Sequence, residues 1–196
     1  MTNLDRLPRE LNHRIKNNFQ IIMSLMNLKQ RTLPPERRED IRFLQEHVQA
    51  MAVTYRLVYD TGEMAHVPVS ALLHEVVAEL RQIGSPGFAQ VKVTDNGAKE
   101  TMDLDKALAF SLYLAAMLPP YLDHARRIAG EVTVSIQVDQ RLLTLSILGS
   151  WGTPVGSDVL RGQLGASRVN QLRAEILPPF DPSNLRFRFP LDERQT

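Results

Sequence analysis

His13 stands on a long polar stripe within the first thirty residues of the chain. Drawn as a helix, one face of this segment carries polar residues at alternating spacings of three and four, and almost none of them is charged: Glu10, His13, Asn17, Gln20, Ser24 and Asn27. Solvated helix faces are normally filled with Lys and Glu, so a face of this kind is unusual. We therefore take the stripe as the candidate functional surface, with His13 at its chemical centre.

An exposed imidazole offers nucleophilic chemistry. An unperturbed histidine has a pKa of about 6.5, so a neutral ring nitrogen is available at physiological pH and accepts a phosphoryl group as a covalent intermediate. Arg14 and Lys16 flank the stripe and would neutralise charge on phosphoryl oxygens, while Asn17, four residues after His13, would orient water or a phosphoryl oxygen. By pattern alone, a surface histidine is more often an ordinary solvated residue.

Two long helices are predicted over residues 1–62. The segment Thr32-Leu33-Pro34-Pro35 breaks them apart, because proline does not continue a helix and disfavours helical backbone before it. The first helix has an apolar stripe: Leu4, Leu7, Leu11, Ile15, Phe19, Ile22, Leu25 and Met26. The second has a heptad seam: Ile41, Leu44, Val48, Met51, Tyr55 and Val58.

An isolated antiparallel hairpin would leave further apolar residues in water: Ile21, Met23, Leu28 and Leu57. We therefore expect two chains to pair into a dimeric four-helix bundle. The alternative is that the hairpin packs against the rest of its own chain.

Residues 65–191 mix helical and strand periodicity, which predicts an α+β layer. We expect a helix capped by Ser70, a strand at Val91–Val93, and a buried helix from Asp103 towards His124 that Pro119-Pro120 kinks or splits. A hairpin around Asp139-Gln140, a glycine-rich stretch over 149–165, a helix over 167–176 and a strand at Leu185–Phe189 follow. Residues 192–196 form a tail.

Composition excludes several classes of function. The formal net charge is +1, which gives no electrostatic case for nucleic acid or an anionic membrane, and cysteine is absent. The apolar run from Ala107 to Leu118 is too short to span a bilayer, and residues 1–10 lack a signal core, so we expect a cytoplasmic protein. His66 and His124 are not spaced as metal ligands, and we expect no metal site.

Residues 10–29, ELNHRIKNNFQIIMSLMNLK, resemble the phosphoacceptor box of the HRxxN, or HWE-related, bacterial sensor histidine kinases. The resemblance extends weakly over the chain. It implies a dimerisation and histidine-phosphotransfer hairpin over 1–62, followed over 65–191 by an α/β sandwich of the gyrase–Hsp90–histidine kinase type. It also makes His13 the phosphorylated residue and a response-regulator receiver domain the partner.

The nucleotide boxes depart from that family. Laid against its N-box, the chain has Ala116 for the glutamate and Pro120 for the magnesium-binding asparagine, and proline offers no side-chain oxygen to the metal. Gly149 stands where the adenine-recognising aspartate belongs, and Trp151 follows as a candidate to fill the nucleotide's space. We therefore expect no nucleotide cofactor in this chain, with magnesium supplied by the receiver.

The resulting hypothesis is a histidine phosphotransferase in a two-component phosphorelay. His13 would exchange a phosphoryl group with a receiver aspartate without ATP hydrolysis, assisted by Asn17, Arg14 and Lys16. The partner would dock on the stripe residues Glu10, Gln20, Ser24 and Asn27. Two alternatives stand beside it: an ATP-dependent histidine kinase with divergent boxes, and a pseudokinase that sequesters a receiver without phosphotransfer.

Overall fold

The computed structural model describes residues 3–60, 66–83, 89–151, 159–178 and 183–191, with the side chains of 3–13, 59, 60 and 159 left out. The elements, in chain order, are α1 (Asn3–Thr32), a 3-10 turn η1 (Pro35–Arg37), α2 (Arg38–Asp60), β1 (His66–Pro68), α3 (Val69–Gln82), β2 (Gln90–Asp95), β3 (Thr101–Asp103), α4 (Leu104–Ile128), β4 (Glu131–Asp139), β5 (Leu142–Gly149), α5 (Val159–Gln171), β6 (Glu175–Ile176) and β7 (Asn184–Pro190).

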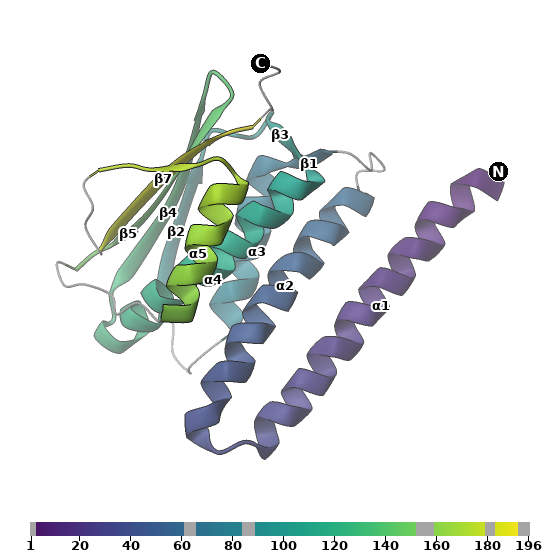
Figure 1. The fold of residues 1–196 in the computed structure, drawn as a ribbon, viewed down its shortest axis with the longest axis horizontal. Helices are drawn as coiled ribbons and strands as arrows, with labels where there is room; N and C mark the ends of the chain where they lie inside the picture. The colour runs from purple at the N-terminus through teal and green to yellow at the C-terminus, as the bar shows by residue number, and fades with distance from the viewer. Residues whose placement is uncertain (1–2, 61–65, 84–88, 152–158, 179–182, 192–196) are drawn as a thin grey trace.

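Helices α1 and α2 form the predicted antiparallel hairpin, and it turns at the two prolines (Figure 1). Helix α1 lies on the outside of the molecule with α2 beside it. On α1, the half-buried apolar side chains are Ile15, Phe19, Met23 and Met26. Its other described apolar side chains, including Leu25 (61% exposed) and Leu28 (63% exposed), lie in solvent. Contacts among the described residues therefore cover only part of the apolar surface of α1.

The expectation that α2 needs a second chain to cover its outer residues is wrong for Leu57. Leu57 is buried together with Ala50, Val53 and Val58 in the same core cluster as the helices and sheet of the following domain. Helix α2 packs against α3 and α4, so the alternative of packing within the chain holds here. Of the predicted heptad seam, Leu44 alone is exposed (47%), Val58 is buried, and the other members are half-buried.

A five-stranded sheet in the order β2-β4-β5-β7-β6 forms the far layer, and α3, α4 and α5 lie between it and α2 (Figure 1). Only the β2–β4 pair is parallel. Alternating residues of the central strands face the helices, and Tyr113 of α4 stacks on Phe187 of β7 with ring centroids 4.3 Å apart. The mostly antiparallel sheet with segregated helices confirms the α+β prediction.

Four local predictions need correction. The helix expected to be capped by Ser70 begins at Val69, after Pro68 in extended backbone. Helix α4 runs unsplit through both prolines, because its neighbouring turns are buried in the core. The β4–β5 turn lies at Gln140 and Arg141, both with positive φ, as a tight two-residue hairpin requires.

The last correction concerns the helix predicted over 167–176. Helix α5 instead spans Val159–Gln171, and Arg173 at φ 52° follows it. Ile176 belongs to β6, where it pairs with Phe187. The short strands β1, β3 and β6 were not predicted, since two or three residues carry no readable alternation. No helix in the described ranges is long and apolar enough to cross a membrane.

Candidate functional site

The predicted polar stripe lies on α1, on the surface of the hairpin. His13 and Glu10 fall within this helix, but their side chains lie outside the described residues. The described members of the site are all exposed: Arg14, Lys16, Asn17, Gln20, Ser24 and Asn27. Their exposure is what a partner-binding face requires, and their individual roles stay predictions.

Two adjoining cavities run along the stripe. The first, of about 740 Å³, lies beside Lys16, Gln20 and Ser24 of α1, and Tyr55 of α2 lines it. The second, of about 830 Å³, continues towards the closed end of the hairpin, where Asn27 lines it. Both cavities share Met23 and Gln49, so we treat them as one feature and call it the hairpin groove.

The floor and walls of the hairpin groove come from three helices. The rings of Phe19 and Tyr55, 5.9 Å apart, form an apolar part of the floor between α1 and α2. Nearer the closed end of the hairpin, Gln45 of α2 donates a 2.7 Å hydrogen bond to the Asn27 side chain of α1. Glu79 and Gln82 of α3, with Ile83 directly after it, line the lower part of the groove, which is the part nearer the closed end, so α3 supplies one wall.

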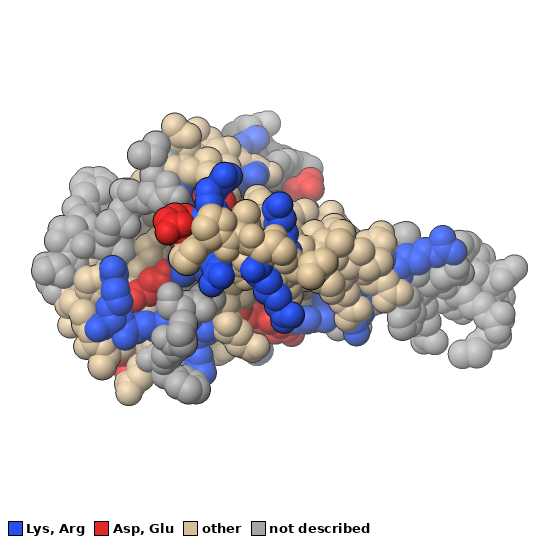
Figure 2. Space-filling model, turned by 90° about the horizontal axis from the view of Figure 1, so that it is seen from below, with Lys and Arg blue, Asp and Glu red and all other residues tan. Residues whose placement is uncertain are grey.

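The closed end of the hairpin carries many charges (Figure 2). Its exposed basic residues are Lys29, Arg31, Arg37 and Arg38. Acidic residues lie among them, and Arg37 pairs with Asp40 at 3.5 Å with both side chains 69% exposed. This mixture of signs is in keeping with the balanced net charge and does not form a single-sign patch.

The positions that the resemblance assigns to magnesium and nucleotide do not fit them. Ala116 is fully buried in α4, Pro120 lies inside the same helix, and Gly149 ends β5. None of these side chains offers an oxygen to a cation or to an adenine amino group. Among the described residues, no cluster of three or more His, Cys, Asp or Glu side chains could hold a metal.

Trp151 covers Gly149. A Cβ atom built on Gly149 would lie 2.5 Å from the Trp151 ring, closer than real side chains approach. The indole also packs against His124 and Tyr121 of α4, with centroid distances of 4.7 and 6.4 Å. An aspartate at position 149 is therefore incompatible with this position of Trp151. The ring lies between β5 and α4, the two elements that carry the divergent boxes.

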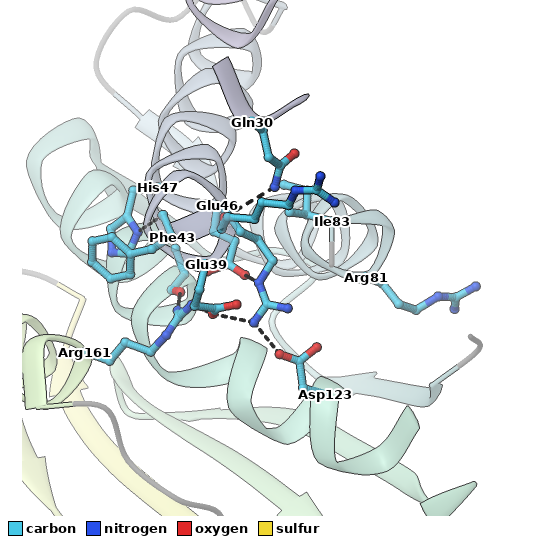
Figure 3. Close-up of polar contacts among 12 residues, drawn as sticks. Gln30, Glu39, Phe43, Glu46, His47, Arg81, Ile83, Asp123 and Arg161 are labelled. Carbon is cyan, nitrogen blue, oxygen red and sulfur yellow. Dashed lines mark hydrogen bonds and ion pairs between the residues drawn. The ribbon is translucent and has the colours of Figure 1, made fainter. Parts of the chain in front are cut away.

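A buried charge cluster that the sequence pattern did not predict lies where α2 meets α4 and α5 (Figure 3). Glu46 is 1% exposed and pairs with Arg161 of α5 at 2.6 Å. Burial raises the pKa of Glu46 to about 7, although Arg161 and Arg42 act in the opposite direction. The available signal was a pair of charges, Arg42 and Glu46, four residues apart on one helix, which resembles an ordinary surface pair.

Comparison with known proteins agrees with this architecture. A family model described as histidine kinase matches residues 10–83, which contain His13, most of α1 and all of α2. Residues 10–83, less than half of the chain, are therefore similar to the histidine kinase family. No curated protein sequence matches the chain.

Solved histidine kinase structures share the fold. The blue-light activated histidine kinase of Erythrobacter litoralis EL346 superposes with a TM-score of 0.67 at 20% identity, over 99% of this chain and 62% of that one. This chain therefore spans less than two thirds of that kinase. Its histidine kinase domain alone gives 0.65 at 20% identity, over 96% and 92% of the two chains. A histidine kinase from Burkholderia phymatum gives 0.50 at 17% identity, over 93% and 98%.

Proposed function

We propose that this protein is a histidine phosphotransferase of a two-component phosphorelay. His13 accepts a phosphoryl group from the phosphorylated aspartate of a receiver domain and returns it in the reverse reaction. The observation that carries the proposal is the combination of a histidine kinase hairpin with nucleotide-box positions that carry no ligand side chains. The chain keeps the helix that presents the histidine and has lost the means to charge it from ATP.

The transfer step needs no group beyond the two partners. A ring nitrogen of neutral His13 attacks the phosphorus of the aspartyl phosphate, the P–O bond breaks, and the aspartate leaves as a carboxylate. Arg14 and Lys16, which lie on α1 within one turn of His13, supply positive charge near the transferring oxygens. Asn17 lies one helical turn after His13 on α1 and orients a phosphoryl oxygen. Magnesium belongs to the receiver.

The receiver docks along the polar stripe and the hairpin groove. Gln20, Ser24 and Asn27 are exposed along one side of this groove, and Glu10 continues the stripe beyond His13. The apolar floor at Phe19 and Tyr55 offers burial, while the amides around it offer hydrogen bonds. The wall from α3 gives the second domain a part in recognition.

A homodimer completes the hairpin. The exposed apolar side chains of α1 and of the α2 seam have no cover among the described residues: Ile21, Ile22, Leu25, Leu28 and Leu44. A second copy pairing along this face would bury them in a four-helix bundle, as the two-helix arrangement favours. The protein carries out this function in the cytoplasm.

The direct test mixes the protein with receiver domains of its host organism, each phosphorylated beforehand with acetyl phosphate. We expect acid-labile, base-stable phosphate to appear on this chain, at His13 by mass spectrometry, and to be absent in His13→Ala. His74→Ala serves as the matched control, because His74 is an exposed histidine of α3. No labelling with any receiver would contradict the proposal.

Two outcomes would replace it with another function. Binding of an unphosphorylated receiver that survives His13→Ala, without any phosphate transfer, would show a sequestering pseudokinase. Transfer of label from γ-labelled ATP to His13 would show a kinase. We expect neither this label nor a change in the fluorescence of Trp151, the only tryptophan, when ATP and magnesium are added.

A further inference from the structure

Five charged side chains connect four helices at the junction of the two domains. Arg161 of α5 donates to Glu46 of α2 at 2.6 Å. Arg42, one turn before Glu46, lies 3.4 Å from it and also pairs with Asp123 of α4. Asp123 in turn accepts from Arg126 at 2.8 Å. We call this set the charge clamp: Arg161, Glu46, Arg42, Asp123 and Arg126.

The charge clamp ends on the backbone at both sides. Arg126 donates to the carbonyl oxygens of Arg81 and Ile83 at 2.7 and 3.4 Å, where α3 ends. Its positive charge is favourable there, because the last carbonyls of a helix carry the negative end of the helix dipole. At the other end, Arg161 donates to the Ala115 carbonyl of α4 at 3.2 Å. Figure 3 shows Arg161 and Asp123 approaching α2 from different elements.

Because the charged side chains of the clamp are buried, their contacts restrict how the helices can be placed relative to one another. The side chains of Arg161, Glu46 and Arg126 are 6%, 1% and 5% exposed. A buried charge pair gains little net stability over an apolar pair, but losing one partner leaves the other uncompensated. Such a cluster therefore penalises any arrangement of the helices in which the pairs separate. A contact between apolar side chains would instead allow the helices to slide past one another.

The charge clamp lies on the first half of α2, whereas the buried apolar residues of α2 lie on its second half. Ala50, Val53 and Leu57 join the second half of α2 to the core of the following domain. The first half, up to Glu46, is joined by charges, and this is the half that lines the lower hairpin groove through Arg42. Ile83, whose carbonyl accepts from Arg126, lines the opposite wall.

We propose that the charge clamp holds α3, α4 and α5 in one fixed arrangement against the first half of α2 and so sets the width of the lower hairpin groove. The clamp acts whether or not a receiver binds, and its test uses none. Its failure is therefore distinguishable from failure of the proposed function.

Hydrogen exchange of the whole 196-residue chain tests the clamp. In Arg161→Met and in Asp123→Asn, we expect amide exchange over residues 38–46 and 79–83 to accelerate at least about tenfold through local opening. Exchange over 50–58 should stay within about twofold of the parent. Asp40→Asn is the matched control, because it removes a charge from an exposed pair of the same helix.

Unchanged exchange in both segments would overturn the proposal, and so would an equal acceleration along the whole chain. If Arg161→Met fails to fold by circular dichroism, Asp123→Asn carries the test, since its side chain is 23% exposed.

A distance measurement gives a second readout. The chain has no cysteine, so spin labels at Lys29→Cys and Arg81→Cys report the span across the groove. With labelled chains diluted into unlabelled ones, we expect one narrow distance distribution in the parent and a broadened one with Asp123→Asn. An equally narrow distribution in both would overturn the clamp.

Discussion

Helices α1 and α2 are adjacent amphipathic helices of one hairpin, yet they bury different parts of themselves. Helix α1 packs on α2, and large apolar side chains such as Leu25 and Leu28 remain exposed. Helix α2 packs on α1, α3 and α4, and buries even the charged Glu46. The difference shows that α2 joins the hairpin to the helices that follow it, whereas α1 leaves large apolar side chains on the surface.

The largest effect should come from shortening the same residue type on the two helices. Leu57→Ala on α2 should lower the free energy of unfolding by about 2–5 kcal/mol, because it leaves a cavity in the shared core. Leu28→Ala on α1 should change it by less than about 0.5 kcal/mol. Denaturant unfolding of both variants, in the monomeric background described next, measures the contrast. Equal losses would erase the distinction between the helices.

The exposed face of α1 should control oligomerisation. Replacing Ile22 and Leu25 with Glu should raise the dimer dissociation constant more than about 100-fold, or about 2.7 kcal/mol, because charges would be buried in the pairing face. Analytical ultracentrifugation measures the constant, and circular dichroism should show an intact fold. Lys29→Glu is the control, since it changes an exposed charged position of α1. A parent protein that is monomeric at all concentrations would refute the pairing.

The buried acid of α2 should give a measurable pH dependence. Because burial raises the pKa of Glu46 from 4.5 to about 7, the folded state binds the proton more tightly than the unfolded state. Above pH 7, the buried negative charge of Glu46 lowers the free energy of unfolding. This destabilisation disappears as the pH falls from about 7 towards 4.5 and the carboxylate takes up a proton. We therefore expect the wild type to gain stability relative to Glu46→Gln between pH 8 and pH 5. Denaturant unfolding at both pH values tests this, and a gain in the opposite direction would contradict the shift.

The smallest effect should be at the exposed end of α2. Asp40→Asn breaks an ion pair with Arg37 in which both side chains are 69% exposed, and should cost less than about 0.5 kcal/mol. Added salt should reduce even this difference. A loss as large as that of Leu57→Ala would mean that the start of α2 is structured differently from the arrangement described above.

Much of the fold could be predicted from short-range patterns in the sequence. The prolines after α1, the alternation of β4 and β5, and the Asp103 cap, whose side chain accepts from the Lys106 amide, all act between near neighbours in the chain. Of the kink or split predicted at Pro119-Pro120, the split is wrong, because a local rule for proline takes no account of the core around Leu118 and Leu122. The start of α5 and strand β6 depend on pairing and packing with distant segments.

The candidate site divides in the same way. The stripe around His13 could be predicted, since the helical period alone places Asn17, Gln20 and Ser24 on one face. The groove beside it could not, because one wall comes from α3, more than fifty residues along the chain. The contact of Trp151 with Gly149 gives the divergent box a steric reason that spacing alone did not provide.

The sequence by itself determined which residues face together on each helix and strand, because those periods are properties of the backbone. It also determined the available chemistry: a histidine on a nearly uncharged polar face, and nucleotide boxes without ligand oxygens. Only the tertiary structure decided that α2 packs against α3 and α4, and that Arg161 and Glu46, 115 positions apart, form a buried ion pair. Such pairings depend on how whole elements pack, and no local pattern records them.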